Sequence, residues 1–353
     1  MSPSVTLVAA SLEILGGQGV QAATLLEQLR ADGQRARFLP IDPELPRAAR
    51  PLRRVRVLRT LVNQALYLPS LRRLAQSDVA HVFCAAYWSF LLAAVPAILA
   101  ARALGKRVIL NYHSGEAPDH LARWGALVHP WLRRVDAIAV PSEFLGEVFA
   151  RHGYRAHVIP NVVDLGHFRF RDRDAGRLRL LSVRNFEAHY RVGNSIEALA
   201  VLLRRRPHAT LTVAGYGSEE AALRRTAARL RGAVRFVGRV PPSAIAELYD
   251  AHDVFLNSSV IDNQPLSILE AFACGLPVVT TATGGIASMV RDGETGLLVP
   301  PDDPVALAAA VERLAQAPGE ARELARRARL AVARHTWPEV RERWLKLYAG
   351  ATP

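Results

Sequence analysis

Cysteine, lysine and methionine are scarce in this chain of 353 residues, which has two of each. Neither Cys84 nor Cys274 lies in a C-x-x-C pair or beside histidines, so nothing indicates a disulfide framework or a structural zinc site. Such cysteine usage is typical of a reducing compartment. Because the first basic residue is Arg30, the chain also lacks the charged region that opens a signal peptide, and we expect a cytoplasmic location.

Aromatic residues are few as well, at 7% against 50% hydrophobic residues, and this balance favours helices packed on sheets over an all-β sandwich. The longest apolar run, VFCAAYWSFLLAAVPAILAA at 82–101, approaches the length of a membrane span. It contains Pro96, and Ser89 could cap a helix. We therefore interpret it as a buried strand, a loop and a helix packed on a sheet.

Negative charge is in deficit, since the formal net charge is +13 and nearly all basic side chains are arginines. The excess suits anionic partners, namely nucleotide phosphates, nucleic acid or an anionic membrane face. It equally suits a GC-rich genome, which enriches arginine and alanine together. Nucleic acid is not expected, because the sequence has neither an aromatic platform nor a helix-turn-helix pattern.

Short apolar runs alternate with longer helical patterns, which predicts βαβ units and parallel sheets. In the first half, strands are expected at residues 4–10, 36–41, 78–84, 106–113, 135–142 and 156–161. The polar, aperiodic segment 162–177 is interpreted as a linker. After it, six more strands are expected at 178–185, 209–217, 234–240, 253–259, 277–283 and 296–301.

The expected fold class is therefore α/β, with two Rossmann-like domains that face each other across a cleft. We place these domains at residues 1–165 and 166–335, followed by a helical segment at 336–353. Ligands of open α/β sheets bind beyond the carboxyl ends of the strands, so the loops that follow the strands are the candidate site.

One such loop opens an apolar helix in the stretch IDNQPLSILEAFACGLPVV, residues 261–279. Pro265 suits the first helical position, and Gly275 suits the residue after the last. The positive end of the helix dipole favours a phosphate at the first free amides, which are predicted at Leu266, Ser267 and Ile268.

Two acids flank this helix mouth. Glu270 lies about one turn inside the helix, where it could accept hydrogen bonds from ribose hydroxyls. Asp262 stands on the loop before the helix and could meet a second polyhydroxyl group. The spacing indicates a ribose–diphosphate–sugar ligand, while a helix with two solvated acids is the alternative.

The segment SSVIDNQPLSILEAFACGLPVVTTATGGIASMVRDGETGLLVPPDD (258–303) resembles the C-terminal half of the retaining glycosyltransferases of family 4, which have the GT-B fold. ILGGQGVQAATLLEQL, LNYHSGEA, VPSEFL, VIPNVVD, VAGYGSEEAALR, FVGRV and LYDAHDVFLNSS follow the family's order. The closing HTWPEVRERWLKLY is similar to its last helix, which crosses back to the N-terminal domain.

This resemblance implies an acceptor-side N-terminal domain and a C-terminal domain that binds a nucleotide sugar. It assigns catalytic roles to His113, Arg184 and Asp262, with Arg184 near the leaving diphosphate and Asp262 near the donor hexose. It implies substrate-binding roles for Gly16, Gly17, Gly19, Asn161, Asn185, Tyr190, Arg191, Gly215, Gly217, Arg239, Val240, Asn263, Leu266, Ser267, Ile268 and Glu270.

Two positions depart from the family pattern. Asp262 stands where the family usually has Glu, which keeps the charge with a shorter reach. The family's Lys near the diphosphate falls on Tyr190, beside Arg191. Either Arg191 supplies the second positive charge or Tyr190 supplies a hydroxyl, and the sequence leaves both open.

The implied reaction transfers a sugar from a UDP-sugar or GDP-sugar with retention at the anomeric carbon. It needs no cofactor and no metal. The implied acceptor is a glycan or a polyprenyl-linked glycan, in the assembly of bacterial surface polysaccharide or lipopolysaccharide.

Other functions are weighed by their residues. A catalytically silent sugar-nucleotide binder would explain Tyr190 at the Lys position. An NAD(P)-dependent oxidoreductase would use GQGVQA (17–22) as its fingerprint, but five residues separate that motif from the first strand. A pyridoxal-phosphate phosphorylase would need a suitably placed Lys, which neither lysine provides.

Two further stretches could indicate a binding partner, a metal ion in one case and a lipid surface in the other. Asp172 and Asp174 spell the D-x-D of metal-dependent transferases, but no strand delivers them and we interpret them as solvated. Residues 47–75 are basic with apolar residues interleaved. They could form an amphipathic element that docks on anionic lipid at the inner face of the plasma membrane, or a helix packed on the sheet with a solvated arginine face.

Overall fold

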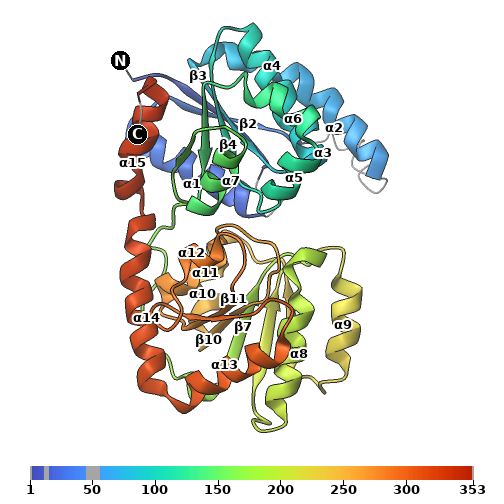
Figure 1. Ribbon diagram of the computed structural model, residues 1–353, viewed down its shortest axis with the longest axis vertical. Coiled ribbons are helices and arrows are strands. Elements are labelled where there is room, and N and C mark those ends of the chain that lie inside the picture. The colour runs from blue at the N-terminus through green and yellow to red at the C-terminus, as the bar shows by residue number, and fades with distance from the viewer. Residues whose placement is uncertain (1, 12–15, 45–55, 352–353) are drawn as a thin grey trace. The chain divides into compact units, whose positions relative to one another are not determined.

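A computed structural model describes residues 2–11, 16–44 and 56–351 of the chain. These residues form two compact α/β units (Figure 1). Unit 1 comprises Met1–Val162 together with Val340–Pro353, and unit 2 comprises Val163–Glu339. The domain limits predicted from the sequence were residues 165 and 335, and the acceptor-side and donor-side labels of the two halves remain predictions.

Unit 1 is built on a parallel sheet of six strands in the order β2-β1-β3-β4-β5-β6. Its strands are β1 (Val5–Ala9), β2 (Ala36–Pro40), β3 (Val79–Cys84), β4 (Arg107–Tyr112), β5 (Ala137–Val140) and β6 (Ala156–Val158). Each lies within a segment expected from the sequence. The inner strands are buried almost throughout, which explains their near-continuous apolar runs.

The helices of unit 1 are α1 (Gly17–Ala31), α2 (Arg56–Ser70), η2 (Leu71–Gln76), α3 (Tyr87–Ser89), η3 (Phe90–Ala94), α4 (Val95–Ala103), α5 (Ala117–Arg123), α6 (Gly125–Leu132) and α7 (Glu143–Arg151). The predicted N-cap at Ser89 is wrong, because the helix after β3 begins at Tyr87. Tertiary contacts set that start, since the Tyr87 ring packs edge-on against His120 and Trp124.

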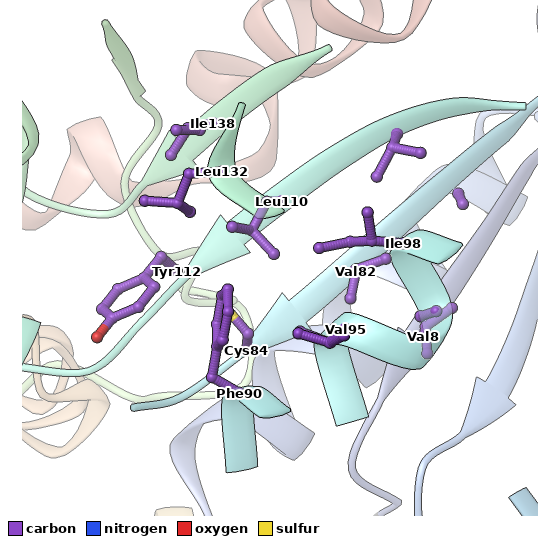
Figure 2. Close-up of a cluster of buried hydrophobic side chains, with 14 of the residues drawn as sticks. Val8, Val82, Cys84, Phe90, Val95, Ile98, Leu110, Tyr112, Leu132 and Ile138 are labelled. Carbon is purple, nitrogen blue, oxygen red and sulfur yellow. The ribbon is translucent and has the colours of Figure 1, made fainter. Parts of the chain in front are cut away.

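One face of the unit 1 sheet carries its main hydrophobic core. Val82 and Cys84 of β3 and Leu110 of β4 point to this face, where they meet Phe90 and Ile98 from the helices that follow β3 (Figure 2). Successive strand residues point to opposite faces, so His81 and Phe83 lie on the other side. The run at 82–101 is thus a strand, a loop and helical turns, as predicted.

The opposite face of this sheet receives the end of α15 (Trp337–Ala349). The Tyr348 hydroxyl lies 2.9 Å from Nδ1 of His81, and the Trp344 ring lies 4.7 Å from the His81 ring. Arg341 forms an ion pair with Asp32 at 2.5 Å. These contacts tie residues 340–349, at the far end of the chain, to the first domain's sheet.

Unit 2 repeats the architecture with the strand order β12-β11-β10-β7-β8-β9, again all parallel. The strands are β7 (Arg179–Val183), β8 (Thr210–Ala214), β9 (Val234–Gly238), β10 (Val254–Asn257), β11 (Val278–Thr281) and β12 (Leu297–Val299). All six lie where the sequence predicts a strand. β7 and β10 are neighbours, although 70 residues (184–253) lie between the end of β7 and the start of β10, so their carboxyl ends emerge side by side.

Two layers of helices cover the unit 2 sheet (Figure 1). One hydrophobic cluster joins it to α8 (Val192–Leu203), α9 (Glu220–Ala228) and α13 (Pro304–Gln316). The other joins it to α10 (Pro242–Asp250), α11 (Leu266–Cys274), α12 (Ile286–Met289) and α14 (Pro318–Val332). Within the described ranges, no helix is long and apolar enough to cross a membrane.

The predicted linker 162–177 is held against unit 2 from its second residue onward. Val163 and Phe168 are buried in the cluster that contains α11. The buried guanidinium of Arg173 donates to the backbone oxygens of His252 and Cys274 at 3.2 and 2.7 Å. The segment therefore has few strands or helices and yet is a packed part of the second unit.

Candidate active site

The helix mouth selected from the sequence lies at the carboxyl edge of the unit 2 sheet. Pro265 is the N-cap and α11 begins at Leu266, one residue later than predicted, because Pro265 keeps an extended backbone with ψ at 123°. Gly275 ends the helix as predicted, in the left-handed conformation with φ at 75°.

The free amides predicted at this mouth need one correction. Ile268 N–H donates to the Pro265 carbonyl at 3.2 Å, so the prediction that its amide is free is wrong. The carbonyl of the N-cap residue accepts this N–H in the first turn of the helix. Leu266 and Ser267 remain at the open end of the helix. The Ser267 hydroxyl is buried and has no hydrogen-bond partner within the described part of the chain, which leaves a polar atom available beside these amides.

Arg184 and Asp262 form an ion pair at this edge, with Nη2 of Arg184 against Oδ2 of Asp262. Arg184 directly follows β7, and Asp262 lies on the loop that follows β10. Both side chains are largely buried, at 15% and 9% exposure. Asp262 also accepts the Asn263 backbone N–H at 2.9 Å, so the loop holds the carboxylate toward Arg184.

Tyr190 and Arg191, the two candidates for the missing Lys, point in different directions. The Tyr190 ring lies under the Arg184 guanidinium at 4.2 Å, a cation–π contact. Arg191 instead pairs with Asp302 at 3.1 Å on the surface, and its backbone is left-handed with φ at 46°. Tyr190 therefore belongs to the Arg184 cluster, whereas the Arg191 guanidinium binds elsewhere.

Glu270 lies one turn inside α11, and its carboxylate accepts the buried Tyr249 hydroxyl at 2.8 Å. The same hydroxyl lies 3.0 Å from the Ser267 carbonyl, which ties Tyr249 to the first turn of α11. Burial raises the pKa of Glu270, and the Tyr249 hydrogen bond and the Arg184 charge partly oppose that rise. Sequence reasoning missed Tyr249, because nothing in a lone Tyr on α10 signals a partner 21 residues away.

Gly215 and Gly217 pack against the backbone that follows β7. A Cβ at Gly215 would lie 1.8 Å from the Arg184 carbonyl oxygen, and one at Gly217 would lie 2.5 Å from that of Phe186. The Arg184 and Phe186 amides donate to the carbonyls of Ala214 and Tyr216 at 2.9 and 2.8 Å. The two glycines therefore allow a close approach that supports Arg184 from behind.

The remaining predicted residues of unit 2 flank this cluster. Arg239 follows β9 and stacks over the Tyr216 ring at 4.2 Å, with Val240 next in sequence. Asn185 follows Arg184 and is half-buried. Asn263 is buried directly after Asp262.

Gly285 is a further requirement that the site prediction did not include. Its N–H donates to the Asp262 carbonyl at 3.3 Å, and a Cβ there would lie 2.4 Å from the Asn263 carbonyl oxygen. The Thr283 hydroxyl bonds the Val260 carbonyl at 2.6 Å. The loop after β11 thus supports the loop that carries Asp262. The Gly-Gly pair at 284–285 was visible in the sequence but carried no assigned role.

A surface cavity adjoins the segment that carries Tyr190. Its walls come from residues 186–188, the first turn of α8 and the start of α9. Polar side chains from Glu187, Arg191, Asn194 and Glu219 line it. Of the residues in this wall, only Arg191 is among the site residues predicted from the sequence.

Unit 1 brings its predicted His113 and Asn161 together at a small cavity. His113 follows β4, Asn161 follows β6, and Gln21 of α1 also lines the space. Burial lowers the pKa of His113 to about 4, so its ring is neutral near pH 7. Nε2 of His113 is buried, has no hydrogen-bond partner among the described residues, and can still bind a hydroxyl.

The motif suggested that the three N-terminal glycines lie in a Gly-rich loop, but only one of them lies outside the helix. Gly16 is the extended N-cap of α1, while Gly17 and Gly19 already belong to its first turn. The Gly16 carbonyl accepts the Val20 N–H at 3.2 Å, which closes the first turn of the helix. The part of the Gly-rich segment at residues 12–15 lies outside the described residues.

The two carboxylates of the D-x-D sequence at 172–174 contact other protein groups. Asp172 pairs with Arg326 at 2.8 Å, and Asp174 accepts the Gly176 N–H at 3.2 Å. Both carboxylates are about half exposed. Among the residues that the structure describes, no group of three or more His, Cys, Asp or Glu side chains could hold a metal ion.

Comparison with known proteins identifies the family of this chain. Residues 15–167 match the family described as Glycosyltransferase Family 4, and residues 177–317 match Glycosyl transferases group 1. A D-inositol 3-phosphate glycosyltransferase of Actinosynnema mirum is 31% identical over 280 residues, which cover 73% of this chain and 67% of that protein. The chain belongs to glycosyltransferase family 4.

Two further relatives of this family 4 chain have different named activities. A glycogen synthase of Mycobacterium tuberculosis is 32% identical over 254 residues, and the amylovoran biosynthesis glycosyltransferase AmsK of Erwinia amylovora is 31% identical over 230. The matches cover 67% and 62% of this chain but 61% and 54% of those proteins. The chain thus spans only between about half and three fifths of the length of these relatives.

The fold of this family 4 chain is GT-B. The crystal structure of the Anabaena protein HepE in complex with UDP-glucose superposes with a TM-score of 0.79, covering 98% of this chain and 99% of that one. The sequence identity is 18%, so this likeness shows the fold alone.

Proposed function

We propose that this protein is a retaining glycosyltransferase that moves a hexose from a UDP-sugar or GDP-sugar to a hydroxyl of an acceptor. The observation that carries the proposal is the cluster at the carboxyl edge of the unit 2 sheet. The cluster offers three kinds of group. Arg184 is a cation, the open end of α11 presents free backbone amides, and Glu270 is an anion one turn inside that helix.

Each group suits one part of such a donor. The Glu270 carboxylate would accept hydrogen bonds from the ribose hydroxyls, and Tyr249 holds it in position. The amides of Leu266 and Ser267, with the unpartnered Ser267 hydroxyl, would meet the diphosphate. Asp262 and Asn263, on the loop before α11, would bind the hexose.

The reaction breaks the bond between the anomeric carbon and the diphosphate oxygen, and the electron pair leaves with that oxygen. The acceptor hydroxyl forms the new glycosidic bond on the same face of the sugar, and its proton passes to the leaving diphosphate. Negative charge therefore grows on the diphosphate while the sugar becomes oxocarbenium-like. A cation already positioned there lowers the barrier, which is the role we assign to Arg184.

The ion pair with Asp262 bears on this role. A diphosphate that binds Arg184 competes with the carboxylate for the guanidinium. Asp262 would then be free to accept a hydrogen bond from a hexose hydroxyl. On donor binding, Arg184 would exchange Asp262 for the diphosphate, and Asp262 would exchange Arg184 for the hexose. The Tyr190 ring keeps the guanidinium in place during the exchange, because a cation–π contact does not use the N–H groups.

In unit 1, the neutral His113 would serve as an uncharged hydrogen-bonding group for a sugar hydroxyl. Its unpartnered Nε2 supports this role, together with the buried Asn161 at the same cavity. We propose a glycan or polyprenyl-linked glycan as the acceptor, in surface polysaccharide or lipopolysaccharide assembly at the cytoplasmic face of the membrane. The relative AmsK, named for amylovoran biosynthesis, supports the polysaccharide setting.

The test is donor turnover. Purified protein is incubated with UDP-, GDP- and ADP-sugars and a panel of glycan acceptors, and release of nucleoside diphosphate is measured. Proton NMR of the product then reports whether the anomeric configuration is retained. Activity should survive EDTA, since Arg184 and the α11 amides supply the positive charge that a metal would otherwise bring.

Two outcomes would overturn parts of the proposal. Loss of turnover in EDTA that Mg²⁺ or Mn²⁺ restores would contradict the metal-free mechanism. Donor binding by calorimetry without turnover on any acceptor would favour a silent sugar-nucleotide binder. That alternative draws support from the pairing of Arg184 and Arg191 with carboxylates.

A further inference from the structure

Helix α2 packs on unit 1 through the side that carries Gln64 and Tyr67. The buried Tyr67 hydroxyl donates to the Ala93 carbonyl at 2.8 Å, and the Gln64 side chain donates to the Leu92 carbonyl at 3.1 Å. Leu71 and Leu74, in the 3₁₀ turns that follow, are buried in the same core. These contacts fix the rotation of α2 about its axis, and with it the side that faces solvent.

The solvent side of α2 is apolar. Val57 is 69% exposed, Leu61 61% and Leu68 48%, and the exposed Leu58 and Ala65 complete the set. The spacing 57, 61, 65, 68 places these side chains on one stripe along the helix. A surface helix normally shows its polar side to water. The alternative raised by the sequence, a helix packed on the sheet with a solvated arginine face, holds in part: α2 packs on unit 1 through Tyr67, but its exposed side carries apolar residues as well as Arg59.

The sequence segment that contains the stripe is strongly basic. Residues 45–77 contain no Asp or Glu and eight arginines, at positions 47, 50, 53, 54, 56, 59, 72 and 73. Arg59, Arg72 and Arg73 are exposed, and within the described part of the chain none of the three has an ion-pair partner. An apolar stripe beside unneutralised guanidinium groups is the pattern of a helix that lies in an anionic lipid interface.

We propose that α2 docks unit 1 on an anionic membrane surface. The helix lies parallel to the bilayer, Val57, Leu61 and Leu68 enter the boundary between headgroups and acyl chains, and Arg59, Arg72 and Arg73 bind lipid phosphates. A second copy of the chain fits this face less well, since two copies of a segment rich in arginine and without Asp or Glu would repel each other.

This inference extends the proposed function by naming the surface that would bring the enzyme to a lipid-linked acceptor. Its test does not depend on sugar transfer. If the protein binds vesicles but transfers no sugar, the docking proposal stands and the proposed function fails. If it transfers sugar but does not bind vesicles, only the docking proposal fails.

The experiment is co-sedimentation of the full chain with two kinds of vesicle. One is pure phosphatidylcholine, and the other is an equal mixture of phosphatidylcholine and phosphatidylglycerol. We expect binding to the anionic vesicles at low salt, little binding to the neutral ones, and weakening as ionic strength rises.

Two pairs of variants separate charge from apolar insertion. Arg72→Gln with Arg73→Gln should lower the partition coefficient on anionic vesicles at least tenfold. The control, Arg204→Gln with Arg205→Gln, removes the same charge from an exposed arginine pair of unit 2 and should bind like wild type. Leu61→Ser with Leu68→Ser should also lose at least tenfold. Its control is Val305→Ser with Leu330→Ser, at exposed apolar positions of unit 2.

Circular dichroism verifies that every variant is folded. Absence of wild-type binding to anionic vesicles would overturn the proposal, as would equal losses in the unit 2 controls. Sedimentation velocity provides a further check. A wild-type dimer that the Leu61→Ser, Leu68→Ser variant converts to a monomer would assign the stripe to self-association instead of lipid.

Discussion

Nη2 of Arg184 contacts Oδ2 of Asp262, and both side chains are largely buried at the carboxyl edge of the second sheet. The Tyr190 ring lies under the same guanidinium at 4.2 Å. A buried cation held by both an anion and an aromatic face is preorganised, because its side chain does not have to reorient or lose bound water when charge develops nearby. The predictions below treat this cluster as the donor end of the site.

Arg184→Ala should lower kcat about 10²–10³-fold, the usual cost of one preorganised group that stabilises developing charge. Donor KM should change less, because the charge on the leaving group is largest in the transition state. Steady-state kinetics with the best donor decides this. Unchanged kcat would remove Arg184 from the chemistry.

Tyr190 and Arg191 should differ when each is truncated. Tyr190→Ala removes the ring under Arg184 and should cost several-fold in kcat, whereas Tyr190→Phe keeps the ring and should be mild. Arg191→Ala should also be mild, because that guanidinium pairs with Asp302 at the surface. If Arg191→Ala were as damaging as Arg184→Ala, Arg191 would have to leave Asp302 when the donor binds.

Glu270→Gln should weaken donor binding about tenfold to a hundredfold, since hydrogen bonds to a charged group contribute about 1.5–3 kcal/mol. Calorimetry with the donor or its nucleoside diphosphate measures the change. Glu247→Gln, at an exposed position of α10, is the matched control and should bind like wild type. Wild-type affinity in Glu270→Gln would exclude contact with ribose.

The same substitution should affect stability in the opposite direction. Burial raises the pKa of Glu270 above the ordinary glutamate value of 4.5, so the native state holds this proton more tightly than the unfolded chain does. Glu270 therefore contributes less to stability as pH rises through the interval between the two pKa values, and above that interval its ionised form is a net cost.

Glu270→Gln should accordingly match the wild type in the free energy of unfolding at acidic pH and exceed it near pH 7. Urea titrations at the two pH values test this sign. A variant that is less stable than wild type at neutral pH would show that the Tyr249 and Arg184 contacts outweigh the desolvation of the carboxylate.

Gly215→Ala should destabilise the fold by at least about 2 kcal/mol, because the new Cβ would lie 1.8 Å from the Arg184 carbonyl oxygen. Gly232→Ala provides the control for backbone strain. It also has positive φ, at 88°, but no atom lies within 4 Å of its Cβ position, so about 1 kcal/mol is expected. Equal losses in the melting temperatures would mean that the loop after β7 yields easily.

The sequence by itself determined the element order and the position of the helix mouth. The buried parallel strands are short apolar runs between helices of period 3.6, so all twelve could be located from local pattern. Pro265 and Gly275 bracketed α11 to within one residue, since their backbone preferences act locally. The family's motifs then pointed to Arg184, Asp262 and Glu270 as members of one site.

Only the tertiary structure decided what these residues touch. β7 and β10 lie side by side because of the strand order of the sheet, and that adjacency brings Arg184 against Asp262. The Tyr249 hydroxyl on Glu270 and the glycine requirement at 215 likewise arise where distant segments meet. The basic and apolar residues interleaved at 47–75 allowed an amphipathic helix, but the packing of Tyr67 and Gln64 on unit 1 decided that the apolar stripe of α2 faces outward. Local pattern selects helix or strand, whereas contacts between distant segments depend on how the elements pack, which no short stretch of sequence encodes.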